Sequence, residues 1–381
     1  MAYNIVFKLR EYSIPLLAGV VLAVLWANLF PDSYQAFIHT ELLLGMDFHF
    51  LVNDIFMVFF FGLAGADIVR SIMPGGSLNP LKTAVSPLVA TAGGVLGPIV
   101  VFIVLNTLIG SPEYIRGWAV PTATDIALAW LTARLIFGSR HPAVAFLLLL
   151  AIADDAVGML IIAVFYPNPL MPPAPLWLVL VPAGMGFAYI LHIAKVRSFW
   201  PYIIGGGLLV WTGMYNAQLH PALSLIFIVP FLAHRESGKD DSTAKEPPLS
   251  LDDFKHKIRP FVDFGLVAFG ISNAGVVFSN VSNLTWIVLI ALLLGKTSGV
   301  FLFASIFRVI GFPLPAGMGT KELFVTALVA AMGLTVALFI AGVAYIDPVL
   351  QGAAKMGALF SAAAGLVAVL AGRWLKIERI E

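Results

Sequence analysis

The sequence predicts an all-α polytopic membrane protein of about twelve transmembrane helices. Three observations predict it: the composition, the spacing of the apolar segments and the placement of Lys and Arg. Of 381 residues, 60% are apolar and 11% are charged, and the mean hydropathy is +0.95. A soluble domain of this length needs far more charge on its surface. We therefore expect lipid to be the solvent for most of the chain.

Twelve apolar segments follow one another along the chain. A helical span takes about 20 residues, so twelve spans use about 240 and leave the rest for short connections. The first segment follows Lys8 and Arg10, as in a signal peptide, but no small-residue cleavage site follows, so we expect it to be retained. The expected spans are 12–30, 52–72, 83–108, 118–138, 142–165, 174–195, 200–214, 219–233, 261–279, 284–305, 321–345 and 349–372.

Two connections differ from the short ones, and the whole of 1–381 is expected to be a single transmembrane domain. Residues 234–260 form a long polar loop between the eighth and ninth helices, and residues 31–51 join the first two helices. With a cytoplasmic N-terminus, all but three of the 22 Lys and Arg fall on the cytoplasmic side. The positive-inside rule then predicts a bacterial inner-membrane protein with both termini and 234–260 in the cytoplasm, and 31–51 in the periplasm.

Some classes of site are excluded. The chain has no cysteine, so it has neither disulfides nor a cysteine metal site. The run Gly295-Lys296-Thr297 resembles the end of a Walker A loop, but Ile290 stands where that motif needs glycine, and no soluble domain is present to bind a nucleotide. We expect no enzyme activity, no cofactor and no nucleic-acid partner.

Asp154 and Asp155 lie in the middle of an apolar segment. Ionisable side chains at membrane depth are costly and face a water-filled or protein-lined interior, so each is a candidate functional group. Adjacent helical residues point about 100° apart, so one carboxylate can face a cavity while the other faces a neighbouring helix. Such a pair can hold protons or a small hard cation, in competition. The alternative is a polar lock between helices.

Two further features lie at membrane depth. The run Pro121-Thr122-Ala123-Thr124-Asp125 interrupts the fourth segment, where proline removes a backbone donor and the threonines and the aspartate offer oxygens suited to sodium. The alternative to a sodium site is an ordinary proline kink in which Asp125 caps the following helix. Capping by Asp125 is compatible with a role in ion binding. Lys296 lies in the tenth segment and needs a carboxylate partner, for which Asp154 or Asp155 is available.

A set of motifs occurs in order over nearly the whole chain: Asn53-Asp54, Gly65 to Arg70, Ala119 to Ala127, Gly138-Ser139-Arg140, Ala153-Asp154-Asp155, Asn273 to Val276, Gly295-Lys296 and Ala354 to Gly357. Together they resemble the NhaA family of sodium–proton antiporters. That family is itself a standard example of inverted-topology repeats with discontinuous helices, so the resemblance, not the composition, implies these repeats and two crossing broken helices.

The resemblance also implies roles for individual residues. Asp155 is the principal carboxylate for Na⁺ and H⁺, and Asp154 is its partner, which pairs with Lys296 when sodium is absent. Thr124 and Asp125 support the crossing of the broken helices and border the transient ion. The second broken helix is expected at 321–345, unwound around Gly333 and Thr335, with Lys355 compensating charge near the crossing.

The chain departs from the family's pattern in two regions. At the second break, Ala330-Ala331-Met332-Gly333-Leu334-Thr335 replaces a glycine-isoleucine-glycine-phenylalanine-threonine run, so we expect the break with altered packing. In the region that the family uses for pH response, Asp67, Val69, Arg70 and Ser71 replace two glutamates and a lysine–arginine pair, and Lys255 beside His256 replaces an acidic residue. Asp67, Arg70, Lys255 and His256 are therefore candidates for an altered pH regulation.

The expected function is exchange of cytoplasmic Na⁺ or Li⁺ for external H⁺ by alternating access, with two H⁺ per Na⁺. This exchange is expected to contribute to pH homeostasis. Three alternatives remain open: a transporter of the same fold that couples Na⁺ to an organic anion, a cation channel without saturable counterflow, and a scaffold that uses 234–260. Membrane lipid is an expected partner. Family analogy also suggests that 31–51 forms a hairpin that pairs two protomers in a homodimer.

Overall fold

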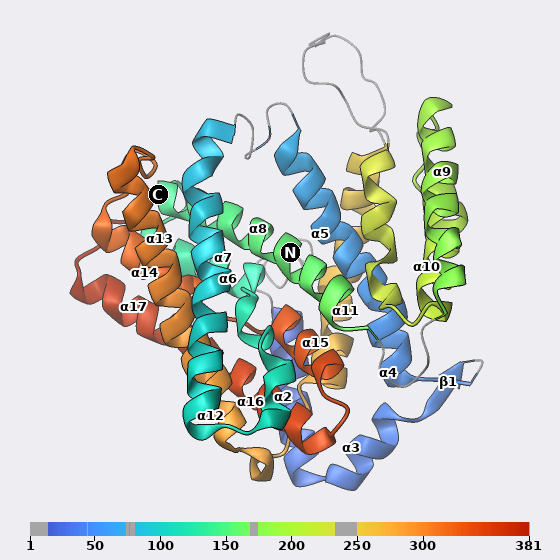
Figure 1. Cartoon of the computed structure of the whole chain (residues 1–381), viewed down its shortest axis with the longest axis horizontal. Coiled ribbons are helices and arrows are strands. Elements are labelled where there is room, and N and C mark those ends of the chain that lie inside the picture. The colour runs from blue at the N-terminus through green and yellow to red at the C-terminus, as the bar shows by residue number, and fades with distance from the viewer. Residues whose placement is uncertain are drawn as a thin grey trace, which may run out of the picture. The chain divides into compact units, whose positions relative to one another are not determined.

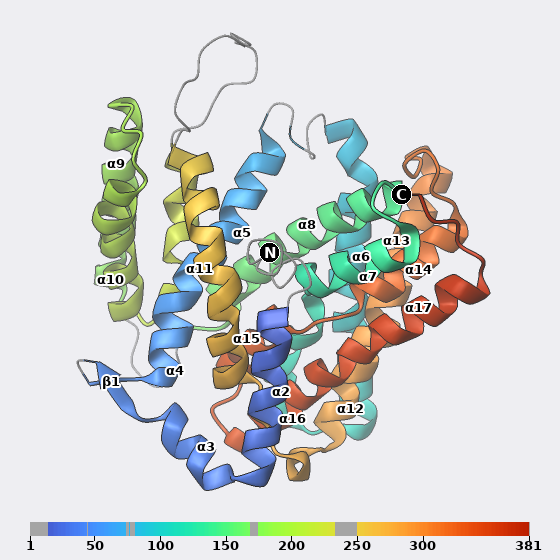
Figure 2. The ribbon, with the colours of Figure 1, turned by 180° about the vertical axis from the view of Figure 1, so that it is seen from behind.

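The computed structural model describes residues 14–43, 45–73, 76, 81–167, 174–232 and 250–380. These residues are predominantly helical, which confirms the predicted all-α class (Figures 1 and 2). The chain divides into two compact units. The first unit comprises Met1–Ala36, Leu81–Gly158 and Phe269–Glu381, and the second comprises Phe37–Pro80 and Met159–Ala268.

Each of the twelve predicted spans overlaps a helical segment among the described residues. Two helix pairs have the length and apolarity of a span only when taken together, and they bend by 52° and 46° at a short break. The segments Ile14–Leu29 and Pro221–Phe231 are apolar but shorter. Six uninterrupted segments have both properties: Phe48–Ile72, Ala84–Ile109, Pro142–Phe165, Pro175–Ile193, Asn283–Ile310 and Pro348–Trp374.

The first unit holds the N-terminal helices, two broken helices and the long helices around them. Its α-helices are α2 (Ile14–Leu29), most of α3 (Pro31–Ile38), α6 (Leu81–Ile109), α7 (Ile126–Phe137), the larger part of α8 (Pro142–Phe165), α12 (Asn283–Ile290), α13 (Thr297–Ile310), α14 (Thr320–Ala330), α15 (Thr335–Ala344), α16 (Pro348–Phe360) and α17 (Ala364–Trp374). A π-helical turn, Ala291–Lys296, joins α12 to α13 without interruption.

The second unit contains the only strands that the described residues form, β1 (Glu41–Leu43) and β2 (Met46–Asp47), paired antiparallel. Its helices are α4 (Phe48–Phe50), α5 (Met57–Ile72), α9 (Leu180–Ile193), α10 (Leu208–Asn216) and most of α11 (Ser250–Asn273). The π-helical turns Leu51–Phe56 and Tyr202–Gly207 precede α5 and α10. Three segments are 3₁₀-helical: Pro175–Val179, Pro221–Phe227 and Val229–Phe231.

The ninth span starts earlier than the sequence predicted, because α11 begins at Ser250. Leu251, Phe254, Ile258 and Val262 are buried at helical spacing, among charged residues that face outward. Average hydropathy is low over such an amphipathic stretch, so residues 250–260 were assigned to the predicted loop 234–260. Residues 233–249 lie outside the described residues.

The segment 31–51 is only partly the hairpin that was expected. Residues Pro31–Ile38 form α3, and the hairpin is confined to Glu41–Asp47, with Gly45 at φ 77° in its turn. The π-helical turn that follows belongs to the second span.

Glycines bring α6 against the span that carries Lys296, and α6 and α13 lie side by side in Figures 1 and 2. A Cβ atom on Gly299 would lie 2.0 Å from the carbonyl oxygen of Gly93, and one on Gly97 would lie 2.2 Å from that of Gly295. The two backbones therefore touch directly, as small residues permit between membrane helices. The π-helical turn that ends at Lys296 packs against α6 at this contact.

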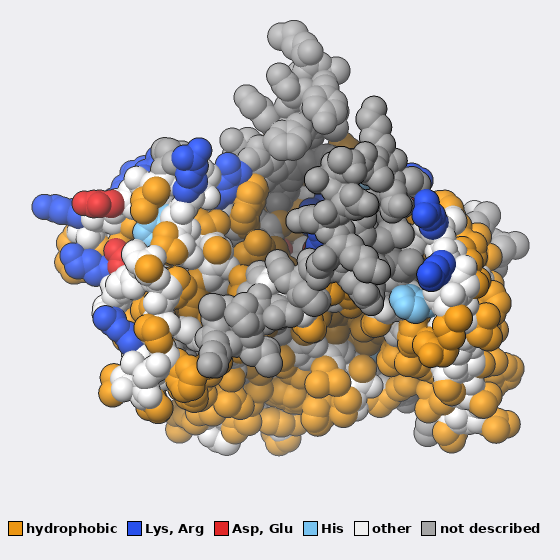
Figure 3. Space-filling model, turned by 90° about the horizontal axis from the view of Figure 1, so that it is seen from above, with side chains coloured by type: hydrophobic (Ala, Val, Ile, Leu, Met, Phe, Trp, Pro, Cys, Tyr) orange, Lys and Arg blue, Asp and Glu red, His pale blue; other side chains and the backbone are white. Residues whose placement is uncertain are grey.

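Large apolar side chains are exposed along the helices, among them Leu108 (72%) and Ile190 (64%). In the view from above, Figure 3 shows Lys and Arg side chains toward the left and the right, with hydrophobic side chains between and around them. Such apolar surface is expected where the surrounding solvent is lipid.

Candidate ion-binding site

Two broken helices occur in the first unit, as predicted. In the first, the 3₁₀ turns Pro112–Gly117 and Val120–Thr122 lead into α7, and in the second α14 leads into α15. Each lies in the chain between two long apolar helices, the first between α6 and α8 and the second between α13 and α16. As the fourth and eleventh of twelve spans, they run in opposite directions, as inverted repeats require.

The two breaks are joined by hydrogen bonds through Asp125. Its backbone N–H donates to the carbonyl of Met332 at 2.7 Å. Its Oδ1 accepts from the backbone N–H of Leu128 at 2.9 Å, and its Oδ2 accepts from that of Thr335 at 3.1 Å. One buried carboxylate thus caps both α7 and α15, whose N-termini carry unpaired donors and partial positive charge.

Thr124 adds a second link across the crossing. Its hydroxyl donates to the carbonyl of Ala330 at 2.8 Å, and its side chain is buried. Carbonyls at the end of α14 lose their helical partners at the break, so a hydroxyl from the other broken helix satisfies one of them. The predicted supporting residues Thr124, Asp125, Gly333 and Thr335 are therefore brought together.

Gly333 lies where the second break packs directly against the backbone of the first. A Cβ atom there would lie 2.7 Å from the carbonyl oxygen of Ala123 and 3.0 Å from Leu292 Cδ2. The N–H of Gly333 donates to Ser361 Oγ at 3.0 Å. Ser361 was not predicted, because a single serine in an apolar segment is too common to indicate a partner.

Gly333→Ala is expected to reduce the exchange rate strongly, because its methyl group must push the first broken helix away. Overpacking of this kind costs about 1–3 kcal/mol. Na⁺-driven pH change in vesicles measures the rate. Gly342→Ala, in α15 after the break, is the control, since its Cβ would meet atoms no closer than 3.9 Å. Equal rates in the two variants would show that the crossing tolerates displacement.

A buried ion pair joins α8 to the tenth span. Lys296 Nζ lies 2.5 Å from Asp154 Oδ2, and both side chains have zero exposure. Lys296 also donates to the carbonyl of Thr122, which the first break leaves without a helical partner. Lys296 thus pairs with Asp154, and it also binds the backbone of the broken helix.

Asp155 follows on α8, 5% exposed, within electrostatic reach of Lys296. Asp154 Oδ1 is buried and makes no hydrogen bond within the described parts of the chain, and Thr124 lies close to Asp154. The cluster therefore combines two carboxylates and one ammonium group with hydroxyl and carbonyl oxygens. With all three groups charged it carries a net charge of −1, which a cation or a proton can neutralise.

Lys355, on α16, lies beside the second broken helix. Its Nζ lies 3.2 Å from Gln351 Oε1 on the same helix, and it faces α15 at Gly342. Gly342 is seven residues beyond Thr335, which is about 10 Å along a helix. Lys355 therefore lies beside α15 of the second broken helix, and its role in compensating charge near the crossing stays a prediction.

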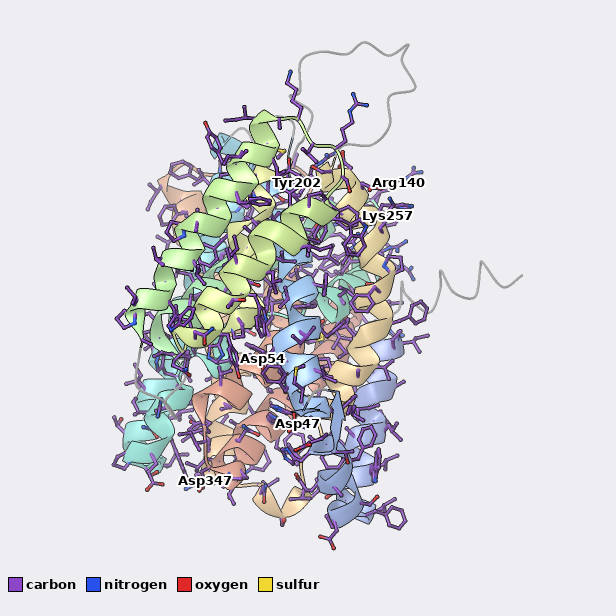
Figure 4. All side chains as sticks on the ribbon, turned by 90° about the vertical axis from the view of Figure 1, so that its right-hand side faces the viewer. Asp47, Asp54, Arg140, Tyr202, Lys257 and Asp347 are labelled. Atoms are coloured by element: carbon purple, nitrogen blue, oxygen red, sulfur yellow. The ribbon has the colours of Figure 1, made fainter. Side chains whose placement is uncertain are left out.

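The candidates for pH regulation lie in the second unit, between α5 and α11. Asp67 accepts from Lys255 at 2.5 Å and from Arg259 at 3.4 Å, and Arg70 lies 2.8 Å from Asp252. His256 is exposed on α11, next to Lys257, which is labelled in Figure 4 and pairs with Asp253. These pairs are partly exposed, so each contributes at most about 1 kcal/mol.

Comparison with known proteins agrees with this geometry. The family model described as Na⁺/H⁺ antiporter 1 matches residues 6–374. The chain belongs to the NhaA family of Na⁺/H⁺ antiporters. The family inferred from the motifs is thereby confirmed.

Relatives within the NhaA family cover the chain almost completely. A protein of Desulfitobacterium hafniense named Na(+)/H(+) antiporter NhaA is 59% identical over 382 residues, 98% of this chain and 96% of its own. One of the same name from Geobacter sulfurreducens is 56% identical over 374 residues, 98% of each chain. The sodium proton antiporter MjNhaP1 of Methanocaldococcus jannaschii, solved at pH 8, has a TM-score of 0.54 at 15% identity and covers 96% of this chain and 90% of its own. The last likeness shows a common fold.

Proposed function

We propose that this NhaA family member exchanges cytoplasmic Na⁺ for external H⁺ by alternating access at Asp154 and Asp155. The observation that carries the proposal is the buried pair of Lys296 and Asp154, with Asp155 beside it and the crossing of two broken helices next to it. Ionisable groups at membrane depth are costly and mark ion pathways and proton relays.

Competition for the same oxygens couples the two ions. When Lys296 forms its ion pair with Asp154, the site is in its sodium-free state. An incoming Na⁺ takes oxygens of Asp155, Asp154 and Thr124, displaces Lys296 from Asp154 and expels protons. The broken-helix bundle then exposes the site to the other side, where protons displace Na⁺. Li⁺, which also favours oxygen ligands, is proposed as a second substrate.

Proton release on ion binding tests this coupling. Adding Na⁺ to the purified protein in weak buffer is expected to release H⁺ saturably, and choline is the control cation. Absence of proton release would overturn the proposal. An organic-anion symporter predicts no pH change without the organic solute, and a channel predicts no saturation of the flux.

We also propose a stoichiometry of two H⁺ per Na⁺, because displacement of Lys296 leaves its ammonium group buried and favours loss of its proton. Each cycle then moves one net charge, which at 100 mV contributes about 2.3 kcal/mol. The rate of exchange in vesicles is therefore expected to depend on an imposed membrane potential. A potential of one sign accelerates exchange, and a potential of the opposite sign slows it. Exchange that ignores the potential would show an electroneutral cycle.

The remaining proposals concern location and regulation. We place both termini and the loop between the eighth and ninth helices on the cytoplasmic side of the inner membrane, on the distribution of Lys and Arg. The ion pairs of Asp67 and Arg70 with α11, together with His256, are proposed to take part in the pH response. The hairpin Glu41–Asp47 is proposed to pair two protomers.

A further inference from the structure

A cavity of about 300 Å³ opens in the first unit where the end of α7 packs beside α17. It takes no part in the ion-binding cluster, because the groups around it come from the far end of α7 and from the C-terminal segment. Its lining is partly apolar and partly cationic, with Leu135, Ile136, Val369, Gly372, Arg373, Ile377 and Arg379 around it.

Backbone hydrogen bonds position the C-terminal segment over this cavity. The N–H of Ile380 donates to the carbonyl of Phe137 at 2.8 Å, and the N–H of Arg140 donates to the carbonyl of Ile380 at 3.1 Å. Gly138, at φ 84°, permits this approach, since a Cβ atom there would lie 2.4 Å from the oxygen of Ile380. Arg379 is thus presented by a segment tied to the end of α7.

The cavity lies beside surface that is typical of a membrane interface. On α17, Leu366, Leu370 and Trp374 are 71%, 63% and 82% exposed. On α7, the guanidinium of Arg134 stacks over Trp130 at 4.5 Å from the ring centre. Tryptophan together with basic residues marks the boundary between hydrocarbon and headgroups.

Two guanidinium groups at one cavity match the oxygens of a phosphate, which arginine binds in a bidentate manner. Basic pockets between membrane helices at headgroup depth favour anionic lipids. We propose that this cavity binds the headgroup phosphate of an anionic phospholipid through Arg373 and Arg379, with an acyl chain along the exposed apolar face of α17. Because Asp125 caps the N-terminus of α7, the bound lipid would hold the opposite end of the helix that the crossing caps.

The test measures lipid retention by native mass spectrometry on the purified full chain, together with the thermal midpoint of unfolding in neutral detergent. Phosphatidylglycerol is expected to be retained and to raise the midpoint, and phosphatidylcholine to do so much less. The double variant Arg373→Gln/Arg379→Gln removes two charge-assisted contacts, so its affinity for phosphatidylglycerol is expected to fall about 100-fold.

Lys321→Gln is the matched control, because Lys321 is exposed on α14 and does not line the cavity; it is expected to retain lipid as the wild type does. Arg373→Lys/Arg379→Lys keeps the charge but loses the bidentate geometry, so it is expected to bind phosphatidylglycerol more tightly than the Gln variant and less tightly than the wild type. Equal retention by the Gln variant and the wild type overturns the proposal. Retention of phosphatidylcholine equal to that of phosphatidylglycerol also overturns it. If inorganic phosphate raises the unfolding midpoint as much as the lipid does, the ligand is free phosphate and the proposal is again overturned.

Discussion

Asp155→Asn is expected to reduce Na⁺-driven alkalinisation of everted vesicles to the background of vesicles that lack the protein. The amide keeps the shape of the side chain but carries neither the negative charge that attracts Na⁺ nor a proton to exchange for it. This is the largest effect on activity that we expect from a single substitution.

The measurement needs a carboxylate control outside the site. Asp32→Asn serves this purpose, because Asp32 is exposed in the first turn of α3, and it is expected to leave the rate unchanged. The amount of protein in the membrane is compared for all three proteins. A wild-type rate in Asp155→Asn would discard the assignment of this residue as the principal carboxylate.

Lys296→Met is expected to give the largest loss of stability. It leaves Asp154 charged and unpaired at zero exposure, and breaking a buried pair from one side costs about 3–5 kcal/mol. The double variant Lys296→Met/Asp154→Asn removes both charges and is expected to recover most of that loss, since uncharged replacements of a buried pair are often neutral. Thermal unfolding in detergent measures both.

Lys355→Met is the matched control for this cycle. Lys355 is also buried, but the hydrogen bond of its Nζ goes to the neutral side chain of Gln351, so its removal leaves no charge behind. Its unfolding midpoint is expected to equal or exceed that of the wild type. If Lys296→Met proves as stable as Lys355→Met, then the pair with Asp154 does not contribute to the folded state.

The membrane class and the order of the spans could be predicted because lipid selects apolar residues locally, segment by segment. Prediction failed at 250–260, where Leu251 and Phe254 are buried on one face of a helix whose other face is charged. Average hydropathy does not separate the faces, so a buried amphipathic turn and a polar loop have similar values.

The amino-acid order by itself determined where the first broken helix is interrupted and which charges are buried in hydrocarbon. Pro121 cannot donate a backbone hydrogen bond, and the twin aspartates of α8 have only apolar neighbours, and both facts hold whatever the rest of the chain does. Only the tertiary structure decided that Asp125 caps two half-helices, that Lys296 pairs with Asp154 and that Arg379 lies over a cavity beside α7. Each of these depends on hydrogen bonds or packing between segments far apart in the chain. Local hydropathy carries no information about which distant groups meet.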